Sequence, residues 1–161
     1  MARTLIVGYG NQYRMDDGVG FRVANEVLQL LGRKPLESGD DGFDDLGHDV
    51  DVVILHQIVP ELAEMVAGYD QVIFVDAHVG VIPESIREER ISASFRNPLV
   101  AHQFHPSTIL ALAEQMSGKA PIATLLSVLG HDFDFGEGLS PDTEALLPDV
   151  VARVTALLGE I

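Results

Sequence analysis

Two adjacent carboxylates follow the first apolar segment of the chain. Residues 5–7 are apolar, Gly8 and Gly10 come next, and Asp16 and Asp17 stand just before an apolar pattern of helical spacing. A short buried strand that ends in glycines is typical of the first strand of an α/β domain, because glycine permits a tight turn. The N-terminus of a helix stabilises the ionised form of a nearby carboxylate. The two carboxylates are therefore candidates for binding a cation, although a single Asp at this position commonly only caps the helix.

Further polar side chains follow the other expected strands. Ligands of an open α/β sheet bind outside the carboxyl ends of its strands, so residues just past those ends are the first candidates for a site. Each of them alone has a structural explanation, such as a cap or a solvated side chain. Together, oxygen and imidazole donors in a chain without cysteine suit a divalent ion such as nickel or zinc. The candidates are Asn11 after the first strand, His56 and Gln57 after the second, Asp76 and His78 after the third, and His102 and His105 before a later helix.

The opening glycine pattern does not fit a dinucleotide-binding motif. The third glycine of that motif would fall at Tyr13, and two carboxylates would repel a pyrophosphate. The sequence also lacks the Walker pattern, the His-Glu-x-x-His pair of zinc proteases and the Gly-x-Ser-x-Gly motif of serine hydrolases. The chemistry of a site must therefore come from the carboxylates and histidines.

The hydrophobic pattern predicts an alternation of strands and helices. Such alternation favours a three-layer α/β/α sandwich on a mostly parallel, mixed sheet of about five strands, in a single domain over residues 1–161. Weaker alternation over residues 86–94 predicts an edge strand. The other expected strands cover residues 5–7, 50–55, 71–75 and 122–129, and the expected helices cover residues 19–31, 58–67, 106–116 and 140–158.

The chain is strongly acidic. Its 161 residues include 25 Asp and Glu but only 10 Lys and Arg, a formal net charge of −15, so binding of nucleic acid is not expected. Much of the acidic excess lies in residues 37–51, which we expect to be a solvated loop, or alternatively a landing area for a basic partner segment. No apolar segment reaches membrane-spanning length and no signal peptide is recognisable, so a soluble, cytoplasmic protein is expected, and its strong negative charge favours a monomer.

Three motifs resemble those of the hydrogenase maturation proteases, the nickel-dependent endopeptidases that trim the large subunit of NiFe hydrogenases. The motifs are Gly8-x-Gly10-Asn11 with Asp16-Asp17-Gly18-x-Gly20, then Phe74-Val75-Asp76-Ala77, and Ala101-His102-Gln103 before a Leu-rich helix. The resemblance extends over nearly the whole chain. It implies that an acidic residue of the opening motif, an aspartate that ends a middle strand and a histidine before a late helix contact the metal. By position these are Asp17, Asp76 and His102.

The implied activity is removal of a short C-terminal extension from the large-subunit precursor after nickel insertion. The nickel would be supplied by the substrate and would serve in its recognition, with zinc or cadmium as substitutes in vitro. Hydrolysis needs a base to activate water, for which Asp16 and Asp76 are the candidates, and Asp17 completes the catalytic carboxylates of an aspartic-type site.

One segment departs from the resemblance. Several members of the family carry a Gly- and Thr-rich loop after the second strand, where this chain has a segment that begins Leu55-His56-Gln57. His56 is a candidate for a further metal ligand and Gln57 for a hydrogen bond to the substrate tail, and Asn11 and His78 are the other candidates for substrate contact. Two alternatives stay open, because binding and catalysis use the same ligands. One is a nickel-dependent chaperone that docks the precursor without cutting it, and the other is a small-molecule metallohydrolase.

Overall fold

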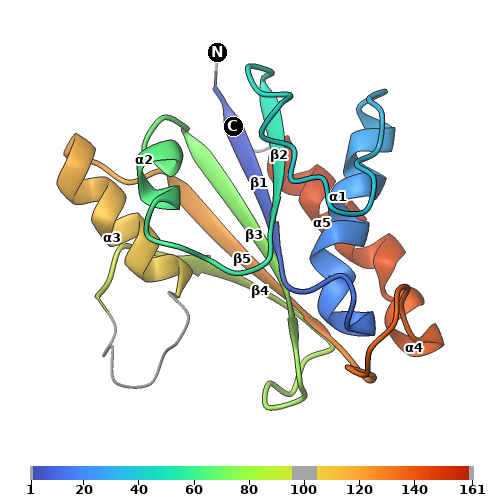
Figure 1. The fold of residues 1–161 in the computed structure, drawn as a ribbon. Helices are drawn as coiled ribbons and strands as arrows, with labels where there is room; N and C mark the ends of the chain where they lie inside the picture. The colour runs from blue at the N-terminus through green and yellow to red at the C-terminus, as the bar shows by residue number, and fades with distance from the viewer. Residues whose placement is uncertain (1, 96–104, 160–161) are drawn as a thin grey trace.

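A five-stranded sheet lies between two layers of helices in the computed structural model, which describes residues 2–95 and 105–159 (Figure 1). The predicted three-layer α/β/α sandwich with a mixed, mostly parallel sheet is thereby confirmed. The strands are β1 (Thr4–Tyr9), β2 (Val50–Leu55), β3 (Gln71–His78), β4 (Ile86–Ile91) and β5 (Ile122–Leu129). The helices are the 3₁₀ helix η1 (Met15–Gly18), α1 (Val19–Leu30), α2 (Leu62–Val66), α3 (Pro106–Ser117), α4 (Pro141–Glu144) and α5 (Leu147–Leu158).

The strand order creates a switch point between β1 and β3. The order across the sheet is β2-β1-β3-β5-β4, and all neighbouring strands are parallel except β4, which runs antiparallel to β5 at the edge. From β1 the chain moves outward to β2 and then returns to the opposite side of β1 to form β3. Ligands of open α/β sheets bind at such a reversal, outside the carboxyl ends of the strands. The fold therefore directs attention to the ends of β1 and β3.

Two separate hydrophobic cores cover the two faces of the sheet. Side chains alternate between the faces along each strand, so Val7 and Phe74 pack under α2 and α3, whereas Ile6 and Val75 pack under α1 and α5 (Figure 1). Because helices cover both faces, the four parallel strands are apolar along most of their length, whereas the edge strand β4 is mostly charged. By the same alternation, Tyr9 packs against the core under α2 and α3.

Some predicted boundaries are wrong for identifiable reasons. The helix expected over residues 140–158 is divided into α4 and α5, because Pro148 in the first turn of α5 has no backbone N–H with which to continue the preceding helix. Strand β3 continues to His78 because β5 pairs with it up to Leu129. Asp76 therefore lies inside a strand and not in the loop after it. No helix within the described residues is both long enough and apolar enough to cross a membrane.

The start of α1 lies directly on the backbone of β1 and β3. A Cβ atom on Gly20 would stand 2.9 Å from the backbone nitrogen of Tyr9 and 2.9 Å from the carbonyl oxygen of Val75, and one on Gly8 would stand 2.6 Å from the carbonyl oxygen of Gly20. The glycines of the opening motif thus permit close packing of a helix on strand ends. This packing brings the residues of η1 to the switch point.

Replacing Gly20 with Ala should therefore destabilise the protein. The added Cβ meets backbone atoms that cannot move independently, so we expect a loss of about 1–3 kcal/mol in the free energy of unfolding, measured by urea denaturation. Gly68→Ala is the matched control, since a Cβ there would meet only an ordinary contact at 3.5 Å. Equal stability of the two variants would contradict this explanation of the motif.

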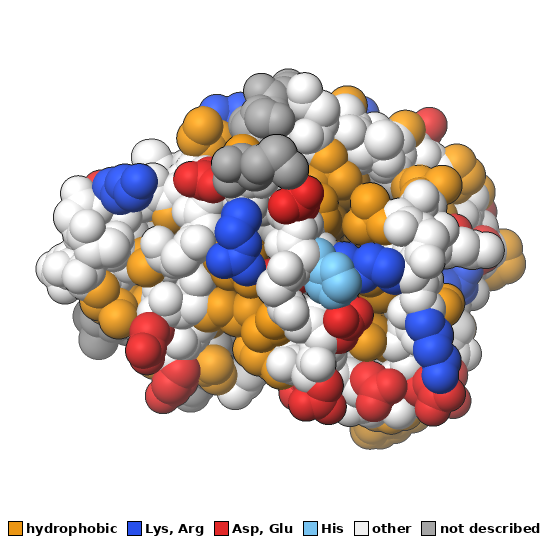
Figure 2. All heavy atoms as spheres, turned by 90° about the horizontal axis from the view of Figure 1, so that it is seen from above, with side chains coloured by type: hydrophobic (Ala, Val, Ile, Leu, Met, Phe, Trp, Pro, Cys, Tyr) orange, Lys and Arg blue, Asp and Glu red, His pale blue; other side chains and the backbone are white. Residues whose placement is uncertain are grey.

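The acidic segment 37–51 is partly structural. Asp51 is buried in β2 and accepts hydrogen bonds from the hydroxyl of Tyr69 at 2.6 Å and from Nη2 of Arg3 at 2.9 Å. The exposed Asp45 pairs with Arg33 at 3.4 Å. Figure 2, which looks at the edge where the parallel strands begin, shows Lys and Arg side chains interspersed with Asp and Glu. The expectation of a wholly solvated loop is therefore wrong for Asp51.

Candidate functional site

Asp76 and Tyr9 lie side by side where β3 and β1 approach their carboxyl ends. Gly8 pairs with Val75, so Tyr9 and Asp76 are the next residues of the two neighbouring strands. The Tyr9 hydroxyl donates a hydrogen bond to the Asp76 carboxylate. The Tyr9 ring packs edge-on against Phe74, with ring centroids 6.4 Å apart. The register of two parallel strands thus fixes a phenol against a carboxyl group at the switch point.

Asp17 lies close enough to Asp76 to affect its protonation. Burial raises the pKa of Asp76 to about 7, and the negative charge of Asp17 adds to the increase, while hydrogen bonds from the Ala77 backbone and the Tyr9 hydroxyl oppose it. Burial also raises the pKa of Tyr9 well above its ordinary value. The negative charge of Asp76 raises it further. A carboxyl group that titrates near neutral pH beside a second carboxylate is a typical candidate for a functional site.

The loop after β1 holds Asp17 in place. The Oδ2 atom of Asp17 accepts a hydrogen bond of 2.7 Å from the backbone N–H of Asn11, and the side-chain oxygen of Asn11 accepts one of 2.9 Å from the backbone of Tyr13. Gly10 has a φ of +134°, and a Cβ on it would stand 2.2 Å from the carbonyl oxygen of Asp17. Asn11 was predicted to contact substrate. Its side-chain oxygen takes part in this turn, and contact with substrate stays a prediction.

Asp16 occupies a very different environment from its neighbour. Its side chain is 0% exposed, and its carboxylate accepts hydrogen bonds from the backbone N–H groups of His131 at 2.7 Å, Asp132 at 2.9 Å and Ser140 at 2.7 Å. The Ser140 hydroxyl donates a further hydrogen bond at 2.7 Å, and the Thr143 hydroxyl lies 2.9 Å away. Burial alone would raise the pKa of Asp16, but these hydrogen bonds lower it to about 2. The contacts favour a structural role over that of a general base.

His78 also has structural contacts. It is buried at the end of β3, where its Nδ1 atom accepts a hydrogen bond of 3.1 Å from the backbone N–H of Gly80. Its Nε2 atom, which then carries the proton, donates to the carbonyl oxygen of Glu84 at 2.9 Å. His78 thereby holds together the turn between β3 and β4, which leaves neither ring nitrogen free for the predicted contact with substrate.

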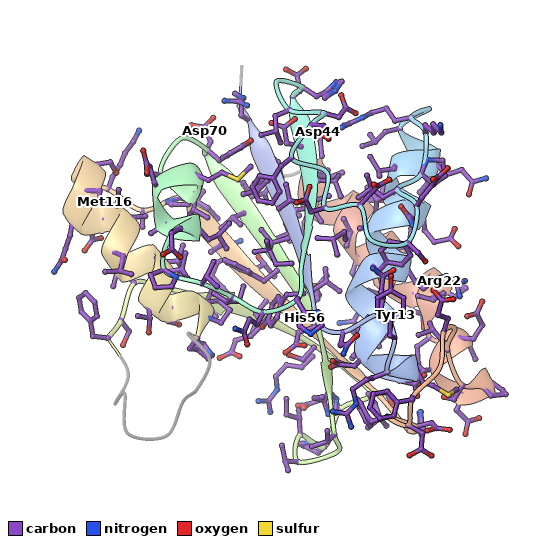
Figure 3. All side chains as sticks on the ribbon, viewed as in Figure 1. Tyr13, Arg22, Asp44, His56, Asp70 and Met116 are labelled. Carbon is purple, nitrogen blue, oxygen red and sulfur yellow. The ribbon has the colours of Figure 1, made fainter. Side chains whose placement is uncertain are left out.

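Two further predicted residues, His56 and Gln57, lie at the same edge of the sheet. His56 and Gln57 are exposed directly after β2, and Figure 3 shows His56 near the end of β1. His105 caps α3, because its Nδ1 atom accepts a hydrogen bond from the backbone of Ser107 at 3.0 Å. His102 lies outside the described residues. Within residues 2–95 and 105–159, no group of three or more His, Cys, Asp or Glu side chains is placed to hold a metal ion. The structure therefore places two members of the expected trio, Asp17 and Asp76.

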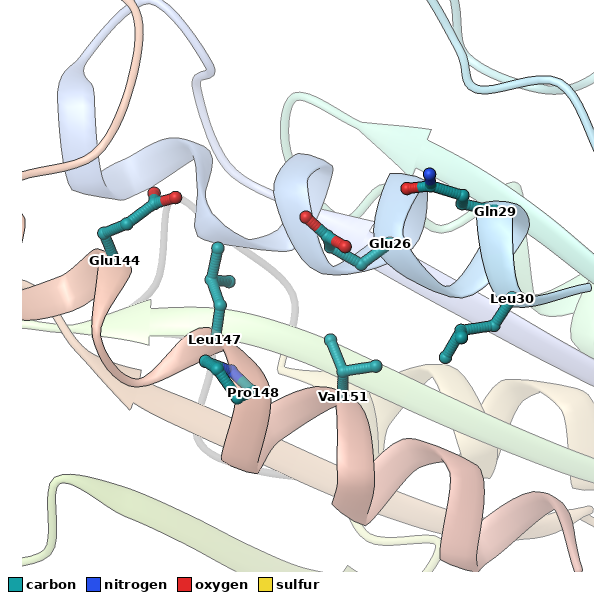
Figure 4. Close-up of a pocket in the computed structure, with 7 residues that line it drawn as sticks. All are labelled: Glu26, Gln29, Leu30, Glu144, Leu147, Pro148 and Val151. Carbon is teal, nitrogen blue, oxygen red and sulfur yellow. The ribbon is translucent and has the colours of Figure 1, made fainter.

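A groove in the helical layer formed by α1 and α5 is separate from the predicted site residues. It has a volume of about 350 Å³ and lies between α1 and α5, with Leu30, Leu147 and Val151 along it and Glu26 and Glu144 at its rim (Figure 4). None of the predicted site residues lines it. The chemistry therefore points to the switch point and not to this groove.

Tyr9 is a site residue that the sequence analysis did not single out. A tyrosine between two glycines does not by itself indicate a functional residue. Tyr9 becomes a candidate because the strand register places it beside Asp76. A register count from the glycine pair could have found it only if the pairing of the first and third strands had been known.

The fold and the carboxyl pair at its switch point define an α/β protein with a candidate hydrolytic centre. No protein-family model matches the chain. Over 98% of the chain and 92% of the relative, its sequence is 27% identical to the hydrogenase 2 maturation protease of Escherichia coli K12. The solved structure of the E. coli hydrogenase maturating endopeptidase HybD matches with a TM-score of 0.70 and 22% identity, over 98% of this chain and 93% of that one.

A similar match comes from an archaeal protein. The NiFe hydrogenase maturation protease HycI of Thermococcus kodakarensis shares 18% identity and a TM-score of 0.67, over 99% of this chain and 94% of that one. The similarity to hydrogenase maturation proteases that the three motifs predicted is thus confirmed along nearly the whole chain. These relatives are named as a protease and an endopeptidase, that is, as peptide-bond hydrolases, in line with the predicted enzyme class.

Tyr9→Phe should shift the dependence of activity on pH. The substitution keeps the ring contact with Phe74 but removes the hydroxyl that stabilises ionised Asp76, so the pKa of Asp76 should rise. We expect the acidic limb of the rate profile for cleavage of a hydrogenase precursor to move to higher pH by up to about one unit. Tyr69→Phe, which removes a tyrosine hydroxyl from Asp51 at the opposite edge of the sheet, is the control. Identical profiles for wild type and Tyr9→Phe would show that the hydroxyl does not act on the reacting carboxylate.

Proposed function

We propose that this chain is an endopeptidase that removes the C-terminal extension of a NiFe hydrogenase large-subunit precursor after nickel insertion. The observation that carries the proposal is that Asp17 lies close enough to Asp76, at the switch point of the fold, for its charge to raise the pKa of Asp76. Support comes from full-length relatives that are named as hydrogenase maturation proteases. The precursor is thus the proposed partner, and nickel enters as part of the substrate.

The oxygen donors fit a divalent ion carried by the substrate. Asp17 and Asp76 are hard carboxylate ligands at one site, and in the proposal His102 adds an imidazole, a donor set that suits nickel and also zinc or cadmium in vitro. The ion would polarise the scissile carbonyl group. Because each carboxylate can offer only a few donor atoms, the proposal expects weak binding of metal to this chain alone.

In this proposal Asp76 is the base that activates water. The pKa of Asp76 is raised to about 7 in the protein alone, and a cation brought by the substrate would favour the ionised carboxylate, which could then accept a proton from water and pass it to the leaving amine. Asp16 is assigned no part in proton transfer, because its carboxylate is buried under hydrogen-bond donors. Asn11 and the exposed His56 and Gln57 are proposed to contact the substrate tail.

The proposal also includes the oligomeric state and the cellular location of the protein. A net charge of −15 opposes association of two copies, so we propose a monomer, and no partner other than the precursor is invoked. We propose the cytoplasm as its location, on the assumption that the hydrogenase precursor is processed in that compartment.

Mass spectrometry of the precursor tests the proposed activity. A nickel-loaded large-subunit precursor incubated with this chain should lose the mass of its C-terminal extension, and a variant that combines Asp17→Asn with Asp76→Asn should leave the mass unchanged. A stable complex in which the precursor keeps its full mass would support a non-cleaving maturation chaperone instead. Turnover of generic peptides without precursor would indicate a small-molecule hydrolase.

A further inference from the structure

The most exposed apolar side chains of the described residues lie on loops around the candidate site. Phe135 is 88% exposed after β5, and Val81 is 84% exposed after β3. Val79 in the same turn and Tyr13 after β1 are also exposed, and Figure 3 shows Tyr13 near the end of β1. We call Tyr13, Val79, Val81 and Phe135 the carboxyl-edge patch. A single exposed apolar residue needs no explanation, but four on the loops that surround one site do.

Hydrogen bonds hold the loops of the patch in fixed positions. The carbonyl oxygen of Tyr13 accepts a hydrogen bond of 2.8 Å from the backbone of Gly136, and the backbone of Met15 donates one of 2.9 Å to Gly136. The Arg14 guanidinium lies 5.9 Å from the centre of the Phe135 ring. The backbone of Gly130 donates to the carbonyl oxygen of His78 at 2.9 Å, which joins the turn after β3 to the end of β5. The apolar side chains are therefore presented in advance of binding, which reduces the entropy cost of an interface.

The charges around the patch indicate what kind of surface it would meet. Residues 131–140 contain Asp132, Asp134 and Glu137 but no Lys or Arg. Asp134 and Glu137 are exposed on either side of Phe135. The charged neighbours of Phe135 are thus Asp134, Glu137 and the Arg14 guanidinium over its ring, so the charge around this apolar centre is acidic on balance and is complementary to an apolar surface with a basic rim. The overall charge of −15 makes a second copy of this chain an unfavourable partner.

We propose that the carboxyl-edge patch docks the folded surface of the precursor that surrounds its extension, through apolar side chains with a basic rim. The inference rests on the proposed function, and it adds that recognition extends beyond the cleaved tail. The patch occupies loops on both sides of the switch point. Binding of an extended tail alone would require contacts only at the candidate site, so the wider patch indicates contact with a larger surface. Burial of Phe135 and Val81 would then contribute to affinity as aromatic and aliphatic anchors.

Binding of nickel-loaded precursor to a Val81→Ser/Phe135→Ser double variant tests this surface. We expect the dissociation constant, measured by isothermal titration calorimetry, to rise by about tenfold or more. The matched control is Leu30→Ser/Met116→Ser, which removes side chains that are 67% and 58% exposed on α1 and α3, and its dissociation constant should stay within about twofold of wild type. Thermal unfolding of both double variants should match wild type, since all four side chains are exposed.

The outcomes separate this inference from the proposed function. Wild-type binding and cleavage with unchanged affinity of the Val81→Ser/Phe135→Ser variant would overturn the docking surface alone. Absence of any binding or cleavage by wild type would overturn the proposed function. A concentration-dependent dimer of wild type that this variant abolishes would make the patch a contact between copies and would also overturn the inference. Affinity that does not fall with added salt would contradict the basic rim of the partner.

Discussion

Replacing Asp76 with Asn should slow cleavage of the nickel-loaded precursor by at least about a hundredfold. The amide cannot accept a proton from water and carries no charge to face a cation, and loss of a general base costs about two to four powers of ten in rate. The residue keeps its size, so the structure around β3 should persist. Single-turnover cleavage followed by mass spectrometry measures the effect. Asp149→Asn, on the exposed face of α5, is the control, and equal rates for the two variants would remove Asp76 from the reaction.

The same substitution should stabilise the protein at alkaline pH. The pKa of Asp76 is raised from 3.8 to about 7 in the folded state, so the neutral carboxyl group is favoured there. Its contribution to stability is complete below the pKa of the unfolded chain and is lost as the pH rises through about 7. A shift of about three units corresponds to at most about 4 kcal/mol. The gain of Asp76→Asn over wild type, measured by urea unfolding, should therefore increase between about pH 4 and pH 8, and a constant difference would contradict the raised pKa.

Replacing Asp16 with Ala should be among the most destabilising single changes in this chain. It removes the buried acceptor of four hydrogen bonds, whose donors lie on the loop after β5 and at the start of α4. We expect a loss of about 3–5 kcal/mol in the free energy of unfolding. Asp142→Ala, on an exposed residue of α4, is the control for urea denaturation. A loss below about 1 kcal/mol at Asp16 would contradict its structural role.

The lowered pKa of Asp16 also predicts how the free energy of unfolding depends on pH in the acidic range. Its pKa is lowered from 3.8 to about 2, so its contribution is complete above the pKa of the unfolded chain and is lost as the pH falls through about 2. The shift of nearly two units corresponds to about 2 kcal/mol. Asp16→Asn should lack this acid-dependent loss. At a temperature where this variant is folded, its cleavage rate should stay within about tenfold of wild type, whereas loss of cleavage in the folded variant would make Asp16 the base.

The sequence predicts the architecture because each strand and helix carries its own signal. Short apolar strands between amphipathic helices indicated the three layers, and the weakly alternating segment at residues 86–94 indicated the edge strand, now β4. The division of the last helix was readable at Pro148, which has no backbone N–H with which to continue a preceding helix. The length of β3 was not readable, since it depends on pairing with β5.

The site could be predicted only in part, because the roles of its residues depend on distant groups. Nothing local distinguishes Asp16 from Asp17, and the donors that bury Asp16 come from residues 115 to 124 positions later in the chain. The contacts of His78 close within its own turn, but they require the geometry of that turn. The side chain of Tyr9 gains its role from strand register alone. Sequence motifs thus supplied the candidate residues, and the tertiary structure showed that Asp16 and His78 have structural contacts.

The most direct test of the proposed function compares two forms of one precursor. The large-subunit precursor is prepared with and without nickel, each is incubated with this chain, and loss of the C-terminal extension is followed by mass spectrometry. If Asp17 and Asp76 act on an ion that the substrate carries, only the nickel-loaded form should be shortened. Equal rates of shortening for the two forms would contradict the central claim.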